Sequence, residues 1–328
     1  MPVQITIIGL GLIGSSIGLG IGIRKDEYYR IGHDRSQEAA KKAEKLGAVD
    51  KTIFNLHRSV EGADIVILAI PVDEIEETLK QIGPDLKENA VLMDTSFSMV
   101  AVSTWVKEYL PSGRHFVTLA PSLNAFHLLE NVTDVEAAQT GIFNQSLMVI
   151  SAPPETNPNA LQLAADIASL LGANPMFADP FEFDGLIAAS CLLPKLAAAG
   201  LIHTVMDQPG WRDGRKLAGK VFIDATVPVS MPDETKAYGY ASLLNRANIL
   251  RLLDTYIEEL QGLRQLIEVG DAQGLQNQLG SAMEARKVWL DQRISNNWDT
   301  RGFAAAPTSG EILGRMIGIK PKNISAAK

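Results

Sequence analysis

The sequence predicts an α/β protein in which an N-terminal Rossmann-type, doubly wound parallel sheet is followed by an all-helical C-terminal domain. Two observations predict this class. Short apolar runs alternate with helical segments over about 180 residues, as in a sheet covered by helices on both faces. After Asp179-Pro180 the segments are long and helical, with no convincing β-rich run. We expect a Rossmann-type domain over residues 1–180, a helical domain over 181–320 and a tail over 321–328.

The strands of the first domain are expected at short runs, and the first of them is a β-branched run that fits a strand buried on both faces of a sheet. These runs are residues 3–9, 28–34, 63–71, 90–94, 114–121, 147–153 and 173–179. Helices are expected between them. The helix expected over residues 36–47 begins with Ser36, a residue type that caps helix N-termini, and stops at Gly47, a residue type that ends helices.

The helical domain is predicted from three segments. Residues 183–206 are long and helical, and Pro194 predicts a kink because proline removes a hydrogen bond from a helix interior. Residues 243–268 carry apolar residues at alternating spacings of 4 and 3, which form one continuous stripe. The stripe consists of Ile249, Leu253, Tyr256, Leu260, Leu263 and Ile267. Residues 275–292 predict a second amphipathic helix. The stripe packs either within its own domain or across a dimer, and the sequence leaves both open.

Composition narrows the class of partner. The net charge of −8 leaves no basic surplus to neutralise nucleic acid phosphates, so we expect no nucleic acid partner. Cys191 is the single cysteine, so an intramolecular disulfide is impossible and a reducing, cytoplasmic location is expected. The start MPVQITIIG lacks a signal peptide's basic region, and the glycine-rich stretch 5–23 predicts a strand and a helix, not a membrane span. No metal is expected, because the histidines lack metal-ligand spacing.

Residues 5–20, ITIIGLGLIGSSIGLG, contain glycines at the spacing G-x-G-x-x-G. The motif follows an expected strand and opens an expected helix, which is the context of a dinucleotide-binding turn. Gly9 allows the tight turn, Gly11 lets the backbone approach a pyrophosphate, and Gly14 lets helix and strand pack closely. The amides at the helix N-terminus then face the phosphates.

Asp34 ends the second expected strand, 20 positions after Gly14, where an acidic side chain binds the ribose 2′-OH of NAD. Arg35 and Ser36 follow and could instead accept the 2′-phosphate of NADP. The carboxylate favours NAD because it repels that phosphate. The next strands end at the same edge of the sheet, so their ends are expected near the nicotinamide. The predicted cofactor-binding residues are Gly9, Gly11, Leu12, Ile13, Gly14, Asp34, Arg35, Ser36, Ala69, Ile70, Pro71, Asp94 and Thr95.

Five segments, taken in order, carry a resemblance to a known family. They are ITIIGLGLIGSS, GHDRS…LGAVD, FEFDGLIAASCLLPKLAAA, GWRDGRKLA and the long C-terminal segment 243–279. Together they resemble the prephenate/arogenate dehydrogenase family over nearly the whole chain. The resemblance implies an NAD(P)-dependent oxidoreductase that oxidatively decarboxylates a cyclohexadienyl carboxylate in tyrosine biosynthesis. It also implies a small carboxylate substrate that binds in a cleft between the domains, and a homodimer formed through the helical domain.

The resemblance is weaker where that family binds its substrate. The family's His-Pro turn reads Ala120-Pro121 here, so the histidine that bonds the oxidised hydroxyl is absent. In the family's Asp-x-x-Ser-x-Lys loop, Asp94 is kept while other residues replace the serine and the lysine. Phe97 replaces that serine and Met99 that lysine. In the helical domain, the family's His-Asp pair reads Phe183-Asp184, and Leu192 and Lys195 stand where the family has histidines. The family's substrate arginine falls on Lys216, with Arg215 beside it. The cofactor half is thus intact while the substrate half is rewritten.

Other side chains could take over this chemistry. Lys195 lies on the first helix after the Rossmann-type domain, where the related β-hydroxyacid dehydrogenases carry their acid/base; the alternative is a helix-surface lysine. The predicted catalytic residues are Lys195, Asn124, Ser96 and Asp184, and the predicted substrate-binding residues are Ser122, His127, Arg215 and Lys216. Two other functions stay open. One is a β-hydroxyacid dehydrogenase or ketoacid reductase that uses Lys195, and the other is a non-catalytic NAD-binding protein.

Overall fold

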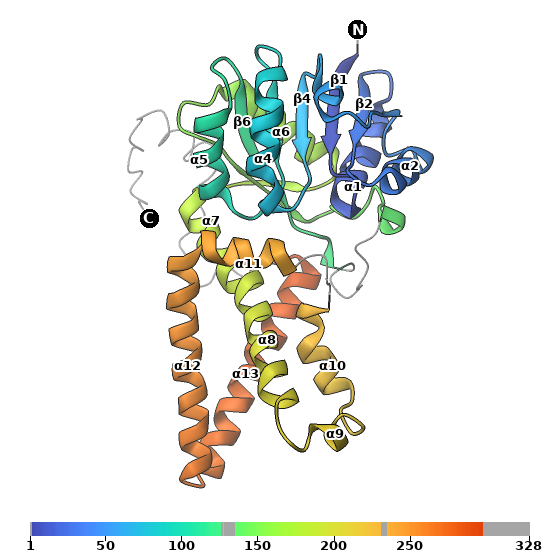
Figure 1. Ribbon diagram of the computed structural model, residues 1–328. Coiled ribbons are helices and arrows are strands. Elements are labelled where there is room, and N and C mark those ends of the chain that lie inside the picture. Colours follow the sequence, from blue (N-terminus) through green and yellow to red (C-terminus); the bar gives the residue numbers. More distant parts are fainter. Residues whose placement is uncertain (1, 126, 128–134, 231–234, 298–328) are drawn as a thin grey trace, which may run out of the picture.

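The chain forms two domains, an α/β domain and a helical domain below it in the view of Figure 1. The structure is a computed structural model that describes residues 2–125, 127, 135–230 and 235–297. The expected tail at 321–328 and the last part of the expected helical domain lie outside these residues. The predicted boundary at 180/181 falls at the first residues of the first helix of the helical domain.

One eight-stranded sheet forms the centre of the first domain, in the order β3-β2-β1-β4-β5-β6-β7-β8. The strands are β1 Val3–Ile8, β2 Tyr28–His33, β3 Lys51–Thr52, β4 Ile65–Leu68, β5 Val91–Asp94, β6 His115–Pro121, β7 Leu147–Ser151 and β8 Asn174–Phe177. The order reverses beside β1, as in a Rossmann-type sheet. The predicted fold class is therefore confirmed.

The sheet departs from the predicted parallel arrangement at β7. Strands β3 to β6 are parallel, β7 pairs antiparallel with β6, and β8 is parallel to β7. A parallel pair needs a crossover to the opposite edge, usually through a helix. Residues 122–146 connect β6 to β7 without an α-helix among their described residues, so β7 starts at the edge where β6 ends.

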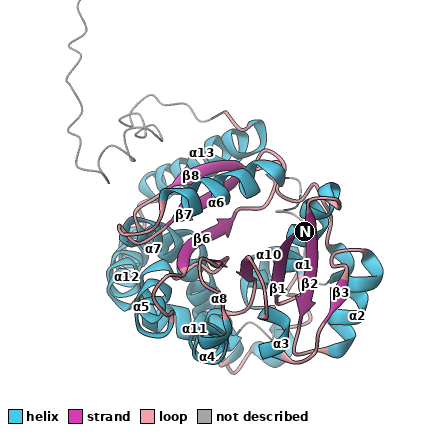
Figure 2. Ribbon diagram, turned by 90° about the horizontal axis from the view of Figure 1, so that it is seen from above, coloured by secondary structure: helices cyan, strands magenta, loops and turns pink. Residues whose placement is uncertain are grey.

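Helices cover both faces of the sheet (Figure 2). The first apolar core joins one face to α1, α2 and α6, and the second joins the other face to α3, α4 and α5. These helices are α1 Leu12–Ile21, α2 Gln37–Leu46, α3 Leu56–Val60, α4 Val72–Ile82, α5 Met99–Tyr109 and α6 Pro158–Leu170. The helix expected at 36–47 is confirmed, because Ser36 caps α2 through the amide of Ala39 and Gly47 ends it with φ = +80°.

The second domain is helical, as predicted. Its helices are α7 Pro180–Ile187, α8 Leu193–Met206, α9 Trp211–Gly214, α10 Lys220–Thr226, α11 Thr235–Leu244, α12 Arg246–Glu268 and α13 Ala272–Ser295. A π-helical segment, Ala188–Leu192, joins α7 to α8 directly before Pro194. The proline cannot donate a hydrogen bond to the carbonyl four residues back. The wider π-helical turn accommodates this missing hydrogen bond at the place where the sequence predicts a kink.

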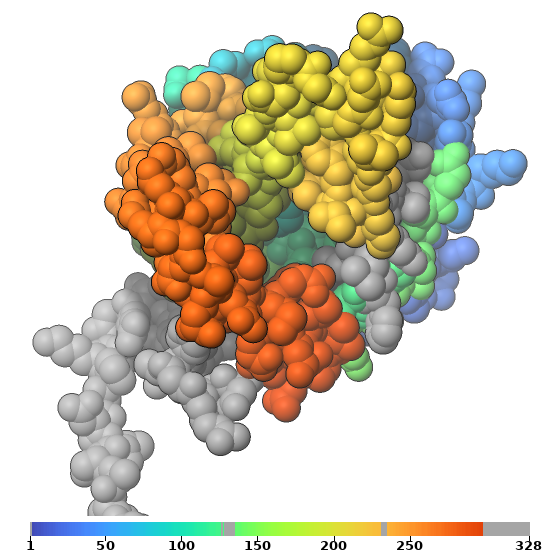
Figure 3. All heavy atoms as spheres, turned by 90° about the horizontal axis from the view of Figure 1, so that it is seen from below, coloured from blue at the N-terminus to red at the C-terminus, as the bar shows by residue number. Residues whose placement is uncertain are grey.

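Three of the six stripe residues on α12 are exposed, and Leu263 is half-buried. Ile249 is buried and Leu253 is half-buried, but Tyr256, Leu260 and Ile267 are 37%, 46% and 64% exposed. Seen from below, α12 and α13 stand apart from α9 and α10, with a hollow between them (Figure 3). Within the part of the chain that the structure describes, the helical domain therefore has exposed apolar surface.

The continuous helical stretch Pro180–Met206 is one source of this apolar surface. It is long and apolar enough to cross a membrane by length and composition, and only 17% of its most apolar window is buried. Such a stretch alone is weak support for a span, because helices packed within soluble proteins can meet the same criterion. Here α8 packs against α10 and α12, so part of the stretch already has protein neighbours.

Candidate active site

The glycine turn between β1 and α1 is closely packed at two glycines and open at the third. Gly9 has φ = +92°, and a Cβ there would lie 2.3 Å from the carbonyl oxygen of Ala69. A Cβ on Gly14 would lie 1.9 Å from the carbonyl oxygen of Gly9. A Cβ on Gly11 would meet nothing within 4 Å. The turn therefore needs glycine at 9 and 14 for packing, and at 11 it leaves space where a ligand can reach the backbone.

The N-terminus of α1 is suited to an anion. Its N-cap, Gly11, provides no side-chain cap, and its first turn contains no acidic residue. The amides of Leu12, Ile13 and Gly14 have no intrahelical acceptor at this end, and the helix dipole is positive here. These features fit the pyrophosphate of a dinucleotide, as predicted for these residues.

Asp34 is fixed beside this turn. Its carboxylate accepts hydrogen bonds from the amides of Leu10 and Ser36, each at 2.7 Å. A carboxylate has about four acceptor sites, so two remain for ribose hydroxyls. The neighbouring hollow has a volume of about 230 Å³, and its lining consists of Asp34, Gln37, Ala40, Lys41, Thr52, Ile53 and Phe54.

The two residues predicted to favour NADP are both engaged elsewhere. The Ser36 hydroxyl caps α2, and Arg35 forms an ion pair with Glu74 in the first turn of α4. Glu74 also brings a negative charge close to the guanidinium that would receive a 2′-phosphate. The geometry therefore favours NAD. Glu74 escaped the sequence prediction, although the acidic first turn of α4 was visible in the sequence.

Asp94 and Ser96 form a polar pair at the carboxyl end of β5. The Ser96 hydroxyl donates to Asp94 Oδ2 at 2.6 Å, and the Ser96 amide donates to Oδ1 at 3.1 Å. Asp94 is fully buried, and burial raises its pKa to about 6 against the lowering effect of the two Ser96 hydrogen bonds. Such a carboxylate changes charge close to neutral pH, as groups of functional sites often do.

Asp184 connects the two domains. Its carboxylate accepts the amides of Met99 at 2.8 Å and Val100 at 3.2 Å, which caps α5. Burial raises its pKa to about 6, while these two amides lower it. Asn245 donates to the Asp184 carbonyl at 2.6 Å. The predicted catalytic role of Asp184 stays a prediction, and its contacts favour a role in positioning α5.

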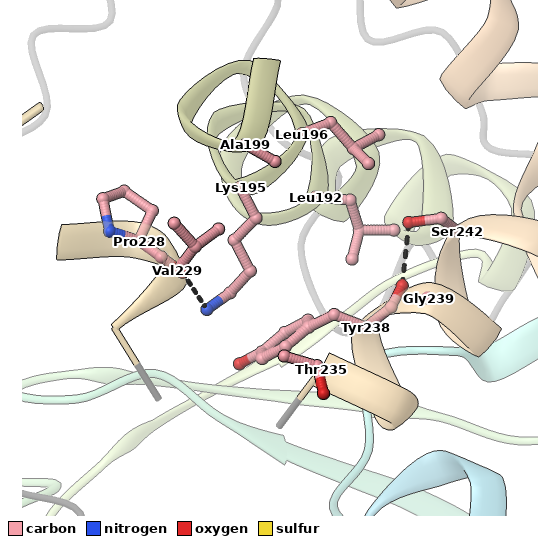
Figure 4. A pocket seen from close by; sticks show the side chains of 10 residues that line it. All are labelled: Leu192, Lys195, Leu196, Ala199, Pro228, Val229, Thr235, Tyr238, Gly239 and Ser242. Atoms are coloured by element: carbon pink, nitrogen blue, oxygen red, sulfur yellow. Dashed lines mark hydrogen bonds between the residues drawn. The ribbon is translucent and has the colours of Figure 1, made fainter. Parts of the chain in front are cut away.

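Lys195 lines a pocket of about 180 Å³ inside the helical domain (Figure 4). Its Nζ donates to the Pro228 carbonyl at 3.0 Å and lies 3.7 Å from the ring centroid of Tyr238. Apart from these groups the lining is mainly apolar, with Leu192, Leu196, Ala199 and Val229. Lys195 is thus half-buried in a concave site rather than a helix-surface lysine, and its catalytic role stays a prediction.

The loop after β6 has fixed side chains. Asn124 donates to the Asn144 carbonyl at 2.6 Å, and the His127 ring lies 3.3 Å from Gln139 Nε2. Ser122 accepts a hydrogen bond at 2.9 Å from Arg293 on α13. Arg293 escaped the sequence prediction because it lies 171 residues further along the chain.

Arg215 and Lys216 lie far from this edge of the sheet. They directly follow α9, at the end of the helical domain most distant from the sheet (Figure 1). Lys216 forms an exposed ion pair with Asp213 at 2.8 Å. Within one chain, the structure therefore does not bring these two predicted substrate-binding residues to the cofactor edge.

Comparisons with known proteins agree with this arrangement. Residues 20–176 match the family described as prephenate dehydrogenase, nucleotide-binding domain, and residues 179–281 match prephenate dehydrogenase, dimerization domain. The prephenate dehydrogenase of Bacillus subtilis is 28% identical over 291 residues, covering 87% of this chain and 76% of that protein. The cyclohexadienyl dehydrogenase of Zymomonas mobilis is 25% identical over 285 residues, covering 86% and 94%.

The chain belongs to the prephenate/arogenate dehydrogenase family. Two solved structures share the fold. One is prephenate dehydrogenase from Aquifex aeolicus in complex with hydroxyphenyl propionate and NAD+, with a TM-score of 0.76 and 21% identity over 88% of this chain and 98% of that chain. The other is Synechocystis arogenate dehydrogenase, with a TM-score of 0.69 and 23% identity over 88% and 100%. Family membership confirms the predicted NAD(P)-dependent dehydrogenase class and does not favour the β-hydroxyacid dehydrogenase alternative.

Proposed function

We propose that this chain is a cytoplasmic NAD-dependent dehydrogenase that oxidatively decarboxylates a small cyclohexadienyl carboxylate of the prephenate or arogenate type. One observation carries the proposal. The glycine turn and the buried Asp94–Ser96 pair lie at the same carboxyl edge of a sheet in a chain matched by both family domains. When bound, the oxidised nicotinamide supplies a hydride acceptor.

In the proposed reaction the carbon that bears the hydroxyl loses a hydride, the ring carboxyl leaves as carbon dioxide, and its bonding electrons make the ring aromatic. The hydroxyl proton becomes more acidic as the hydride departs. The family's histidine would accept a hydrogen bond from this hydroxyl, and Ala120 stands in its place. A different acceptor is therefore needed at this edge.

The Ser96–Asp94 pair can supply that acceptor. Ser96 Oγ keeps a free lone pair while its own proton points at Asp94 Oδ2, so it can accept from the substrate hydroxyl. The buried carboxylate polarises the serine most strongly when it is ionised. Because the pKa of Asp94 is about 6, its ionised fraction rises as the pH rises through 6. We expect kcat/KM to rise over the same range.

The test is NADH formation with prephenate and with arogenate. We expect turnover of at least one of them, and we expect Asp94→Asn to lower kcat by about 10²–10⁴-fold, the range for losing a general base. Ser96→Ala should lower it similarly and Ser98→Ala, in the same loop, should not. Tight NAD binding without turnover of either acid would support the non-catalytic alternative instead. Full activity of Asp94→Asn would exclude the pair as the acceptor.

Lys195 provides a second, separable candidate for acid/base chemistry. Its pocket lies in the helical domain, and its ammonium is held between a carbonyl and an aromatic face. If Lys195→Ala abolishes turnover of another hydroxy acid while prephenate and arogenate remain unused, the ketoacid reductase alternative gains support. If Lys195→Ala leaves NADH formation unchanged, its predicted catalytic role is excluded.

We further propose that the chain forms a homodimer through its helical domain. The match to a family domain described as a dimerization domain supports this, since it spans residues 179–281. So do the exposed stripe on α12 and the hollow beside it in Figure 3. An apolar face of this kind is unfavourable in water, and a second copy offers the matching face under two-fold symmetry.

A further inference from the structure

We propose that Arg293, near the C-terminal end of α13, binds the side-chain carboxylate of the substrate, the one that the reaction keeps, at the carboxyl end of β6. The inference rests on the proposed function, because it names the group that recognises the acid at that same site. Four observations lead to it: the position of Arg293, its contacts, its uncompensated charge and its place relative to the cofactor edge.

Arg293 reaches the α/β domain from the helical domain. Helix α13 runs back from the far end of the α12–α13 hairpin toward the sheet (Figure 1). At its end, Arg293 Nη2 donates to Ser122 Oγ at 2.9 Å and to the Leu123 carbonyl at 2.6 Å. Ser122 directly follows β6, two positions after Ala120, where the family has its histidine. The guanidinium therefore lies beside the position whose usual side chain is missing.

The charge of Arg293 has no acidic partner among the described residues. Both of its acceptors are neutral, and its side chain is half-buried. Arg30 shows how the same chain treats a buried arginine: its guanidinium pairs with Asp50 at 2.6 Å and with three carbonyls. Removing a cation from water without a nearby negative charge is unfavourable in free energy. Binding of an anion to Arg293 would offset that cost. Burial lowers its pKa, in keeping with that cost.

The strand order places Arg293 at a suitable distance from the reacting groups. Asp34 lies at the end of β2, so the adenosine half of NAD is expected on the β2 side of β1. The nicotinamide half then extends to the other side of β1, toward β4 and β5. Strand β6 is the next neighbour, about 5 Å beyond β5. A six-membered ring acid with its carboxylate on Arg293 can therefore place its ring toward Ser96.

The positions where the family carries positively charged side chains do not place a charge beside β6 in this chain's described structure. Met99 and Ala120 are uncharged where the family has lysine and histidine, and Arg215 and Lys216 lie at the far end of the helical domain. Arginine also suits the task chemically, because its planar fork can hold a carboxylate with two parallel hydrogen bonds. Among the described residues, Arg293 thus supplies a positive charge at the end of β6 where the family's lysine and histidine are replaced.

The test compares an acid with its neutral analogue. We would titrate the full-length protein, with and without NAD, with 3-(4-hydroxyphenyl)propionate and with the corresponding carboxamide. The wild type should prefer the acid. Arg293→Gln should weaken binding of the acid by about 10–100-fold, as expected for a lost charge-assisted contact, and leave the carboxamide unchanged. Arg293→Lys should restore part of the preference. Arg286→Gln, an exposed position on the same helix, is the matched control.

The outcomes separate this inference from the proposed function. Equal loss of acid and carboxamide binding in Arg293→Gln, or no loss of either, would show that Arg293 only attaches α13 to the sheet. No preference for the acid in the wild type would also overturn the inference. Absence of NAD binding would remove the proposed function, and the titrations without NAD would still decide the role of Arg293.

Discussion

The α/β domain and the helical domain bury their apolar residues to very different extents. In the first domain, strands β1, β4 and β5 are lined by fully buried aliphatic side chains, and both faces of the sheet are covered. Among described residues 181–297, the buried apolar side chains are Phe183, Ala188, Leu192, Ala198, Ala241 and Ile249. Leu217, Val221 and Leu243 are more than 70% exposed. The first domain completes its own core, whereas the described part of the second leaves large apolar side chains exposed, which agrees with the proposed dimer.

The same contrast separates the two halves of the site. The cofactor side is made of backbone and close packing, so its residues are fixed by the sheet: Gly9 and Gly14 cannot carry a Cβ. The proposed substrate side is made of side chains from distant segments, such as Ser96, Ser122 and Arg293. Side chains on loops and helix ends can be exchanged without disturbing a core, which fits the many replacements there.

The strongest way to test the cofactor half is Gly11→Asp. The new side chain starts in open space, so folding should be preserved, but its charge and bulk occupy the path of the pyrophosphate. We expect NAD affinity to fall by about 1000-fold, which corresponds to losing two charge-assisted hydrogen bonds. Calorimetry measures the affinity, and thermal denaturation checks the fold. Unchanged affinity would contradict the assignment of the turn, and Gly11→Ala should show a smaller loss.

The helical half is tested by placing a charge on the exposed stripe. Leu260→Glu should weaken dimer formation by about 100-fold, because a two-fold interface buries the new carboxylate twice. Light scattering after gel filtration over a range of protein concentrations measures this. Gln261→Glu, an exposed neighbour on the same helix, should leave the assembly intact. A wild-type protein that is monomeric at every concentration would contradict the proposed dimer.

Asp94 is buried in the first domain and is also part of the proposed hydrogen-bond acceptor. We expect Asp94→Asn to stabilise the fold. The folded-state pKa of about 6 lies above the ordinary value of 3.8, so the folded state binds the proton more tightly. Proton binding by Asp94 therefore adds to the unfolding free energy. This added stability is fully present below pH 3.8 and is lost as the pH rises through 6. The variant should therefore be more stable by about 3 kcal/mol at pH 8 and no more stable below pH 4.

Denaturant unfolding at several pH values measures this difference. Asp254→Asn, which changes an exposed carboxylate on α12, is the control and should leave the pH dependence of stability as it is in the wild type. A constant difference between wild type and Asp94→Asn across the whole pH range would contradict the role of burial. Higher stability together with lower activity would mark Asp94 as a residue kept for function.

The smallest effect is expected at the adenosine end of the cofactor site. Glu74→Gln should raise the affinity for NADP relative to NAD by about 3–5-fold, because it releases Arg35 and removes a like charge near the 2′-phosphate. An exposed ion pair contributes little, which limits the size of the change. Parallel titrations with both dinucleotides give the ratio. Glu77→Gln, one turn along α4, should leave the ratio unchanged.

The predicted elements of the first domain rest on local sequence patterns, and the structure contains them. The buried strands, the Ser36 cap and the Gly47 stop all depend on neighbouring residues. Strand β3, Lys51–Thr52, was missed because two residues are too short for any periodicity. The reversed direction of β7 was missed because an apolar run does not encode the direction of a strand.

The site divides in the same way. The glycine turn and Asp34 follow from spacing in the sequence, because each residue acts close to its place in the chain. The contacts of Asp184 with α5, and of Arg293 with the end of β6, join segments 85 and 171 residues apart. Only the packing of two domains creates such contacts, so sequence spacing carries no signal for them.

The reversal at β7 has a further consequence. Since β6 ends and β7 begins at the carboxyl edge, the connection between them starts and finishes at the edge of the sheet where the proposed site lies. A longer or shorter insert there would change the surroundings of the proposed ligand site while the parallel ladder from β3 to β6 keeps its hydrogen bonds. This connection is consequently a place where new ligand specificity could be grafted onto the same nucleotide-binding framework.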